Sequence, residues 1–197
     1  MNIYAWIIVG CWTVFLFYWI ISSFSVKRDV DGSWWGWGGS GWRLRMLYAL
    51  VLVLLWRYAF PDARGYHIGL LSSGWMLSGN LVLDVLGAVL CVLGIALAIW
   101  ARVHLGANWS SHPTLKENHA LVTSGPYALI RHPIYTGVIV AALGSVLVSL
   151  PWILLALLIA GMFVWRVKKE EALMTRQFPD QYLPYKARTW ALIPWVW

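Results

Sequence analysis

The sequence predicts an all-α, polytopic integral membrane protein with about five transmembrane helices. Of its 197 residues, 60% are hydrophobic and only 12% are charged, whereas a soluble domain carries about 25% charged residues. Sixteen tryptophans are also typical of a membrane protein, because indole rings favour the two bilayer interfaces, and we expect most of them there. This composition excludes a soluble globular domain and a disordered chain.

Five apolar runs approach or reach the length of about 20 residues that a helix needs to cross the bilayer. They span residues 3–22, 44–60, 81–103, 134–150 and 152–167. The first is too long and too aromatic for a signal peptide. The last two are separated only by Pro151, which predicts a tight helical hairpin. A weaker run, 68–77, is too short to span, and we expect it at the interface, like the Gly- and Trp-rich loop 27–43.

Lysine and arginine are distributed unevenly between the loops that join these runs. Thirteen of the fifteen cations fall in alternate loops and in the C-terminal tail. Because cytoplasmic loops carry an excess of these residues, five spans are favoured, with the N-terminus outside and the C-terminus in the cytoplasm. We expect the protein in the cell inner membrane. The basic residues are scattered rather than clustered, so no nucleic-acid partner is predicted.

Most histidines and prolines lie in two predicted cytoplasmic segments, the loop 104–133 and the tail 168–197, and we expect any chemistry where these segments meet. The histidine spacings match no common ligand pattern, so no metal site is predicted. Cys11 and Cys91 lie inside apolar runs and are expected to be core residues rather than a disulfide. Asp84 is an acid near a helix end, from which it can reach the outer interface.

The Arg131-His132-Pro133 step predicts the start of the fourth membrane helix. A proline disfavours helix at the residue before it, so His132 should be extended, and Pro133 suits the first helical turn. Unpaired N–H groups at such a start can hold a carboxylate or phosphate, to which Arg131 and His132 would add donors. The alternative is that Arg131 is a positive-inside anchor and that His132 faces the headgroups.

Three charged residues lie where the fifth helix is predicted to leave the bilayer. Arg166 and Glu170 are spaced i,i+4 and should share a helix face, with Glu171 next to them. They form either a charged pair facing a cytoplasmic cavity or a snorkelling arginine with a solvated partner. Beyond them, the tail cannot be one helix, because prolines interrupt it, and we expect a lid on the membrane surface. The prolines concerned are Pro179, Pro184 and Pro194.

Two separated motifs resemble the isoprenylcysteine carboxyl methyltransferase family of integral membrane enzymes. The first is HALVTSGPYALIRHPIYTG at residues 119–137, in which Gly125-Pro126-Tyr127 reads as a turn. The second consists of Arg166, Glu170, Glu171, Phe178, Tyr182 and Tyr185. The resemblance covers residues 81–197, which we take as a methyltransferase core, whereas residues 1–80 match only in kind. The short loops and brief N-terminus point to a prokaryotic member.

The resemblance implies an S-adenosylmethionine-dependent methyltransferase whose cytoplasmic cofactor pocket is closed by the C-terminal segment. Arg166 matches the arginine assigned to substrate binding and methyl transfer, and Glu170 would share the catalytic site and also touch the cofactor. A further polar residue of the loop remains open between His112, Thr114 and Lys116. The cofactor contacts implied are His119, Ala120, Leu121, Val122, Tyr127, His132, Pro133, Ile134, Tyr135 and Glu170.

The acceptor implied is lipophilic and enters from the membrane lipids. A carboxylate is favoured, such as that of a prenylcysteine or another isoprenoid acid, while O-, S- and N-methylation all stay open. One alternative is an NADPH-dependent reductase of the sterol-reductase type, which shares the Arg-His-Pro-x-Tyr step but usually has asparagine where this chain has Ile134. The other alternative is a non-catalytic membrane subunit, against which the intact polar residues argue.

Overall fold

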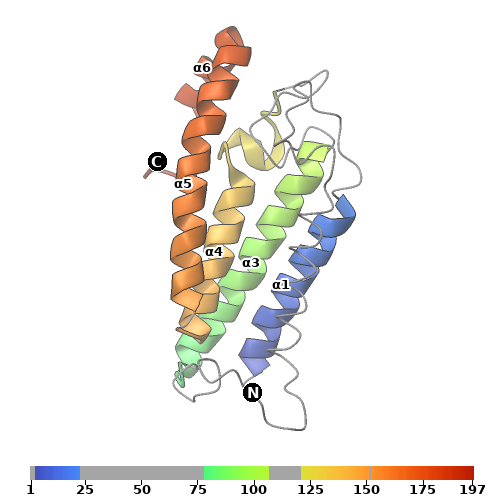
Figure 1. Cartoon of the computed structure of the whole chain (residues 1–197), viewed down its shortest axis with the longest axis vertical. Helices are drawn as coiled ribbons and strands as arrows, with labels where there is room; N and C mark the ends of the chain where they lie inside the picture. Colours follow the sequence, from blue (N-terminus) through green and yellow to red (C-terminus); the bar gives the residue numbers. More distant parts are fainter. Residues whose placement is uncertain (1–2, 23–77, 107–120, 151) are drawn as a thin grey trace.

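The computed structural model describes residues 3–22, 78–106, 121–150 and 152–197, and the regular structure in these ranges is helical. The all-α class predicted from the sequence is therefore confirmed for this part of the chain. Figure 1 shows α1, α3, α4 and α5 running alongside one another, with α6 at one end of the bundle. The elements are α1 (Ile3–Ser22), α3 (Leu81–Leu105), η3 (Gly125–Ala128), α4 (Pro133–Val148), α5 (Trp152–Gln177) and α6 (Pro179–Ala187).

The helix bounds agree with the predicted spans to different degrees. Of the described helices, α1 and α3 are long and apolar enough to cross a membrane. Helix α4 has only 16 residues, whereas α5 has 26 and continues to Gln177, well beyond the predicted span 152–167. The predicted span 44–60 and the segments 27–43 and 68–77 lie outside the described residues, so the number of five spans stays a prediction.

The first turn of α3 contains Asp84, the acid that the sequence places near a helix end. The side chain of Asn80 caps the helix by accepting from the backbone N–H groups of Val82 and Leu83. Asp84 is buried in the first turn and accepts a hydrogen bond of 2.6 Å from the Ser78 hydroxyl. This carboxyl is thus held inside the protein.

Helices α3 and α4 pack with their backbones in contact, because glycines face each other across the interface. A Cβ atom built on Gly94 would lie 2.5 Å from the Gly137 carbonyl oxygen and 2.5 Å from the Ala141 nitrogen. Gly87 and Gly144 oppose each other in the same way. Small residues at such spacing allow the close helix approach that stabilises membrane bundles. This interface fixes where α4 begins relative to α3.

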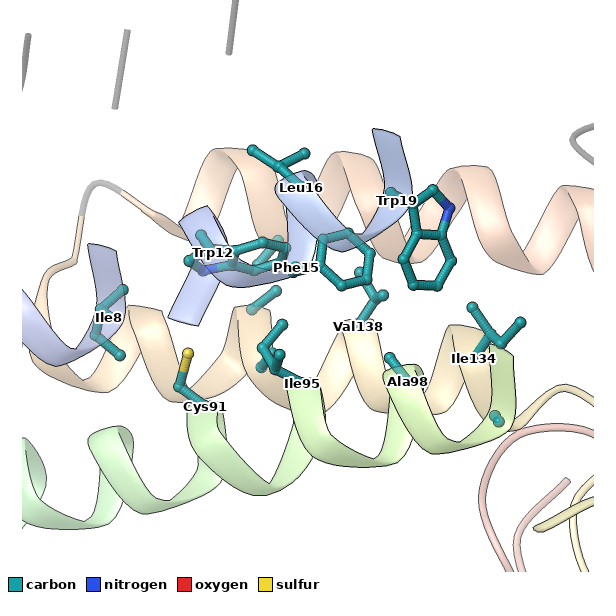
Figure 2. Close-up of a cluster of buried hydrophobic side chains, with 14 of the residues drawn as sticks. Ile8, Trp12, Phe15, Leu16, Trp19, Cys91, Ile95, Ala98, Ile134 and Val138 are labelled. Atoms are coloured by element: carbon teal, nitrogen blue, oxygen red, sulfur yellow. The ribbon is translucent and has the colours of Figure 1, made fainter. Parts of the chain in front are cut away.

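Helix α1 covers this pair with aromatic side chains. Trp12, Phe15 and Trp19 are buried and point from α1 toward α3 and α4 (Figure 2). The Trp12 indole Nε1 donates 3.0 Å to the Ser145 hydroxyl of α4, and its ring stacks on Trp152 at 5.9 Å. Trp12 and Trp19 are therefore core residues of the described part of the chain. Cys91 is also buried in this core, as predicted, and both cysteines are free.

A buried arginine, Arg102, joins the C-terminal ends of α1 and α3. Arg102 donates 3.0 Å to the Ser22 carbonyl of α1 and 2.7 Å to the Gly106 carbonyl beyond α3. A cation is favourable at helix C-termini, where carbonyl groups lack intrahelical partners. Arg102 thereby fixes the register between α1 and α3 at this end.

The glycine interface makes a stability prediction. Gly94→Ala should lower the free energy of unfolding by about 1–3 kcal/mol, because the added methyl group meets backbone atoms that no rotamer change can move. Gly161→Ala on α5 is the matched control, since a Cβ there meets nothing within 4 Å in the described part of the chain. Thermal unfolding of both purified variants in one detergent measures the difference. Equal melting temperatures for the two would contradict the packing described.

Candidate active site

Polar side chains from three stretches of the chain come together in one site. The stretches are the start of α4, the C-terminal half of α5, and the end of α6 with the residues after it. Figure 1 shows α6 at one end of the bundle. The meeting point of these stretches is the one expected from the sequence, where the loop 104–133 and the tail 168–197 come together.

The start of α4 has the predicted helix boundary, but His132 is not extended as expected. His132 adopts a non-helical conformation (φ −124°, ψ 59°), and Pro133 is the first residue of the helix. The N–H groups of Arg131 and His132 donate to the carbonyls of Trp190 and Ala191 at 2.8 and 3.1 Å. The C-terminal segment therefore pairs with the two residues directly before the helix.

Glu170 is the centre of the first polar cluster. Its Oε1 accepts from the Arg166 Nε at 2.7 Å and from the Tyr135 hydroxyl at 2.6 Å. Its Oε2 lies 3.5 Å from the His132 Nδ1. The predicted sharing of one helix face by Arg166 and Glu170 is confirmed. Four residues singled out in the sequence thus share one site, although they come from two helices more than thirty positions apart.

Aromatic rings support this cluster from one side. The Tyr135 ring stacks between His132, at 5.5 Å, and Phe163, at 4.3 Å, with both pairs nearly parallel. The Arg166 guanidinium lies 5.7 Å from the centre of the same ring. A cation near an aromatic face is favourable, and more so where water is excluded. The stack therefore holds the charged groups in place along an apolar wall.

Glu171 is the centre of a second cluster, which the sequence reasoning missed. Its Oε1 binds the Arg131 Nε at 2.7 Å, and its Oε2 binds the Lys186 Nζ at 2.6 Å. The His132 Nε2 lies 3.7 Å from Oε1. One signal was available, because a pair of adjacent acids is a high local concentration in a chain with only eight acids. Its partners are 40 and 15 positions away, so no local rule identifies them.

The remaining implied cofactor residues fall into two groups. Tyr127 is buried in η3, where its hydroxyl faces the Ala101 carbonyl and its carbonyl accepts 2.7 Å from the Tyr185 hydroxyl of α6. Its contacts thus run to α3 and α6 rather than to Glu170. Leu121 is partly exposed, Val122 packs against the main core, and Pro133 and Ile134 are buried. His119, Ala120, His112, Thr114 and Lys116 lie outside the described residues.

The tail is not one helix, as expected, but one of its three prolines does not interrupt a helix. Helix α5 ends at Gln177 and α6 begins at Pro179, so the tail is not one helix. Pro184, however, lies inside α6 and does not interrupt it. It is exposed, so the Asp180 carbonyl that its missing N–H leaves unpaired can bind water. Buried Tyr182 and Tyr185 anchor the opposite face of this short helix.

The surroundings shift the pKa values of Glu170, Glu171 and His132. Burial opposes the charge of both glutamates, but His132 and the neighbouring basic side chains outweigh it and lower the pKa of Glu170 and of Glu171 to about 2. Burial likewise opposes a charged His132, yet the two carboxylates raise its pKa above the usual value. At neutral pH the site therefore holds two ionised carboxylates and an imidazole biased toward its cationic form.

Residues 86–176 match the model of the isoprenylcysteine carboxyl methyltransferase (ICMT) family. The chain is 28% identical over 156 residues to protein-S-isoprenylcysteine O-methyltransferase A of Arabidopsis thaliana, covering 78% of this chain and 73% of that protein. It is 34% identical over 109 residues to protein-S-isoprenylcysteine O-methyltransferase of Schizosaccharomyces pombe, covering 53% of this chain and 46% of that protein.

A solved structure agrees with these matches. The fold resembles that of the eukaryotic intramembrane Ras methyltransferase ICMT, with a TM-score of 0.51 and 27% sequence identity. The likeness covers 79% of this chain and 53% of that chain, so this chain spans about half the length of the solved relative.

The cluster of His132, Tyr135, Arg166 and Glu170 lies inside the region that matches the family model. The match to the isoprenylcysteine carboxyl methyltransferase family covers somewhat less than half of this chain, and the chain is similar to members of that family over this region.

The charged clusters predict how stability depends on pH. The glutamates stabilise the fold above their ordinary pKa of 4.5, and this contribution is lost as pH falls toward 2. His132 contributes below its ordinary pKa of 6.5, and its contribution is lost as pH rises through its higher folded value. The melting temperature should therefore be highest between pH 4.5 and 6.5.

Melting curves recorded from acid to alkaline pH test this profile without any ligand. In His132→Asn the decline on the alkaline side should become smaller, and the acid-side decline should also lessen, because His132 helps to lower the pKa of both glutamates. An alkaline slope equal to that of the wild type would show that His132 does not carry the effect.

Proposed function

We propose that the chain transfers a methyl group from S-adenosylmethionine to the carboxylate of a lipophilic acceptor, such as a prenylcysteine or another isoprenoid acid. The observation that carries this proposal is the cluster of His132, Tyr135, Arg166 and Glu170, which lies within the matched region and faces the end of the bundle. The relatives' names describe the same reaction on isoprenylcysteine.

The residues present fit the proposed cofactor. The His132 Nε2 is buried and has no hydrogen-bond partner among the described residues, so it can donate to a carboxylate. Glu170 can accept from an ammonium group or from ribose hydroxyls. When bound, S-adenosylmethionine supplies an electrophilic methyl carbon. The cofactor residues proposed are those implied by the sequence, from His119 to Glu170.

Arg166 is proposed to hold the acceptor. Its Nε contact with Glu170 fixes the plane of the guanidinium, and 22% of the side-chain surface remains exposed, which an incoming carboxylate can reach. Arginine binds carboxylates through two parallel hydrogen bonds. A carboxylate is already ionised at neutral pH and needs no general base, so alignment and the exclusion of water are the protein's main contributions.

Exposed apolar side chains on α5 support the choice of a lipophilic acceptor. Large apolar side chains of α5 are exposed, among them Leu154, Leu157 and Leu158, and in a bilayer they would face lipid. We propose that the acceptor enters from the membrane lipids toward a core formed by residues 81–197, with the loop 104–133 and a lid at 168–197. We place the site in the cytoplasm and the N-terminus outside, in the cell inner membrane.

Arg166→Ala should separate turnover from cofactor binding. Loss of the guanidinium should lower kcat by about a hundredfold or more, because the reacting carboxylate loses its oriented donors. The dissociation constant for S-adenosylmethionine should change much less. Lys169→Ala is the matched control, since Lys169 lies on the same helix but contacts the Trp165 ring instead of the cluster. Full turnover in Arg166→Ala would refute the assignment of Arg166.

Calorimetric titration with S-adenosylmethionine and with NADPH distinguishes the methyltransferase from the reductase. Saturable heat with the first ligand alone is expected, and heat with NADPH alone would overturn the proposal. Labelled methyl transfer to a prenylated cysteine with a free carboxylate then identifies the acceptor atom. The label should be released by alkali, because an ester hydrolyses whereas a methyl thioether or methylamine does not.

A further inference from the structure

The end of α6 and the residues that follow it are joined by hydrogen bonds to the residues directly before α4. We call residues 185–192 the C-terminal clasp. Trp190 N donates 3.1 Å to the Leu129 carbonyl, and the Trp190 and Ala191 carbonyls accept from Arg131 and His132. These bonds form an isolated parallel bridge beside the proposed cofactor site. The clasp is therefore positioned by the backbone next to His132.

The Arg131 side chain also donates hydrogen bonds to the clasp. Its Nη1 donates to the Lys186 carbonyl at 3.1 Å, to the Thr189 carbonyl, and to the Thr189 hydroxyl at 3.3 Å. Only 7% of this side chain is exposed. A buried guanidinium of this kind requires a negative partner, since an unpaired buried charge is costly.

Glu171 supplies that partner and adds another bond to the clasp. One carboxylate oxygen binds Arg131 and the other binds Lys186, whose own carbonyl accepts from Arg131. Both oxygens of Glu171 are thus engaged by the clasp and its anchor. Glu170 differs, because its partners Arg166, Tyr135 and His132 all belong to the proposed cofactor and acceptor site.

His132 connects the two clusters. Its Nδ1 lies 3.5 Å from Glu170 and its Nε2 lies 3.7 Å from Glu171, so the ring is held between the two acids. The ring orientation consequently depends on both carboxylates and on the clasp that binds its backbone N–H. A change at Glu171 should reach the cofactor site through His132 without touching the cofactor.

We propose that Glu171 is a positioning residue that keeps the C-terminal clasp closed over His132 and thereby sets the affinity for the cofactor. The identity of that cofactor rests on the proposed function above, but the clasp itself rests on the contacts described. Glu171 acts through Arg131 and Lys186 and touches neither methyl donor nor acceptor.

The expected effect follows from the population of the closed state. If the loss of one charge reduces the closed fraction to about one tenth, the apparent dissociation constant of a ligand that needs the closed clasp rises about tenfold. The rate constant kcat at saturating cofactor should change far less, because a bound cofactor restores the closed form. Proteolysis reports the open fraction directly when opening is fast relative to cleavage.

The experiment compares Glu171→Gln with the wild type in two measurements. Calorimetry gives the dissociation constant for S-adenosylmethionine. Limited trypsin digestion without any ligand gives the rate of cleavage after Lys186 and Arg188, which lie in the clasp, with the α5 site Arg176 as an internal reference. Both the dissociation constant and the clasp cleavage rate should rise by about tenfold or more in the variant.

Asp180→Asn is the matched control, because it removes one exposed carboxylate from the same end of the chain and should leave both values unchanged. Lys186→Met, at a half-exposed site, should shift the dissociation constant and the cleavage rate after Arg188 in the same direction by a smaller factor. Because this variant lacks the trypsin site at residue 186, its cleavage is compared with the wild type at Arg188 alone. It covers the case in which Glu171→Gln fails to fold. A folded Glu171→Gln with wild-type affinity and wild-type cleavage would overturn the proposal. So would a loss of kcat with unchanged affinity.

The two proposals fail differently. If the wild type does not bind S-adenosylmethionine, the proposed function fails, while the trypsin comparison still tests the clasp. If the wild type binds it and Glu171→Gln shows faster clasp cleavage but unchanged affinity, the clasp is real and its coupling to the cofactor site is refuted.

Discussion

Two adjacent carboxylates on α5 must be neutralised at the edge of a largely apolar protein, and the arrangement of the site follows from this requirement. Burial penalises both charges, so each needs cations and hydrogen-bond donors close by. Arg166 lies one turn away on the same helix, but the other partners come from α4 and from the end of the chain. The acids therefore draw three separate stretches of sequence together.

The partners from α4 are in reach because of the helix packing further along the bundle. Gly87 and Gly94 on α3 meet Gly144 and Gly137 on α4 with backbone contact, and larger residues would push α4 away. The first residues of α4 are Pro133, Ile134 and Tyr135, and the position of Tyr135 against Glu170 depends on where this helix lies. A contact among glycines inside the bundle thus determines a hydrogen bond at its end.

Local features of the site could be predicted from the sequence, whereas long-range ones could not. Pro133 marks a helix start by its own geometry, and Arg166 with Glu170 shares a face because of helix periodicity. The same local reasoning failed at Pro184, because whether a proline ends a helix depends on which side of that helix faces solvent. The burial of Trp12 and Trp19 could not be predicted either, since composition does not tell which face of α1 meets α3 and α4.

The partners of Glu171 show why the rest escaped prediction. Arg131 and Lys186 are far from Glu171 in sequence and are ordinary cytoplasmic cations by any local rule. Their role follows only from the fold, through the angle between consecutive residues of a helix, which is about 100°. That angle directs Glu170 toward Arg166 and Tyr135 and directs Glu171 toward the clasp, with His132 between them. Two identical side chains, one position apart, consequently have different partners, because Glu170 faces Arg166 and Tyr135 whereas Glu171 faces Arg131 and the C-terminal clasp.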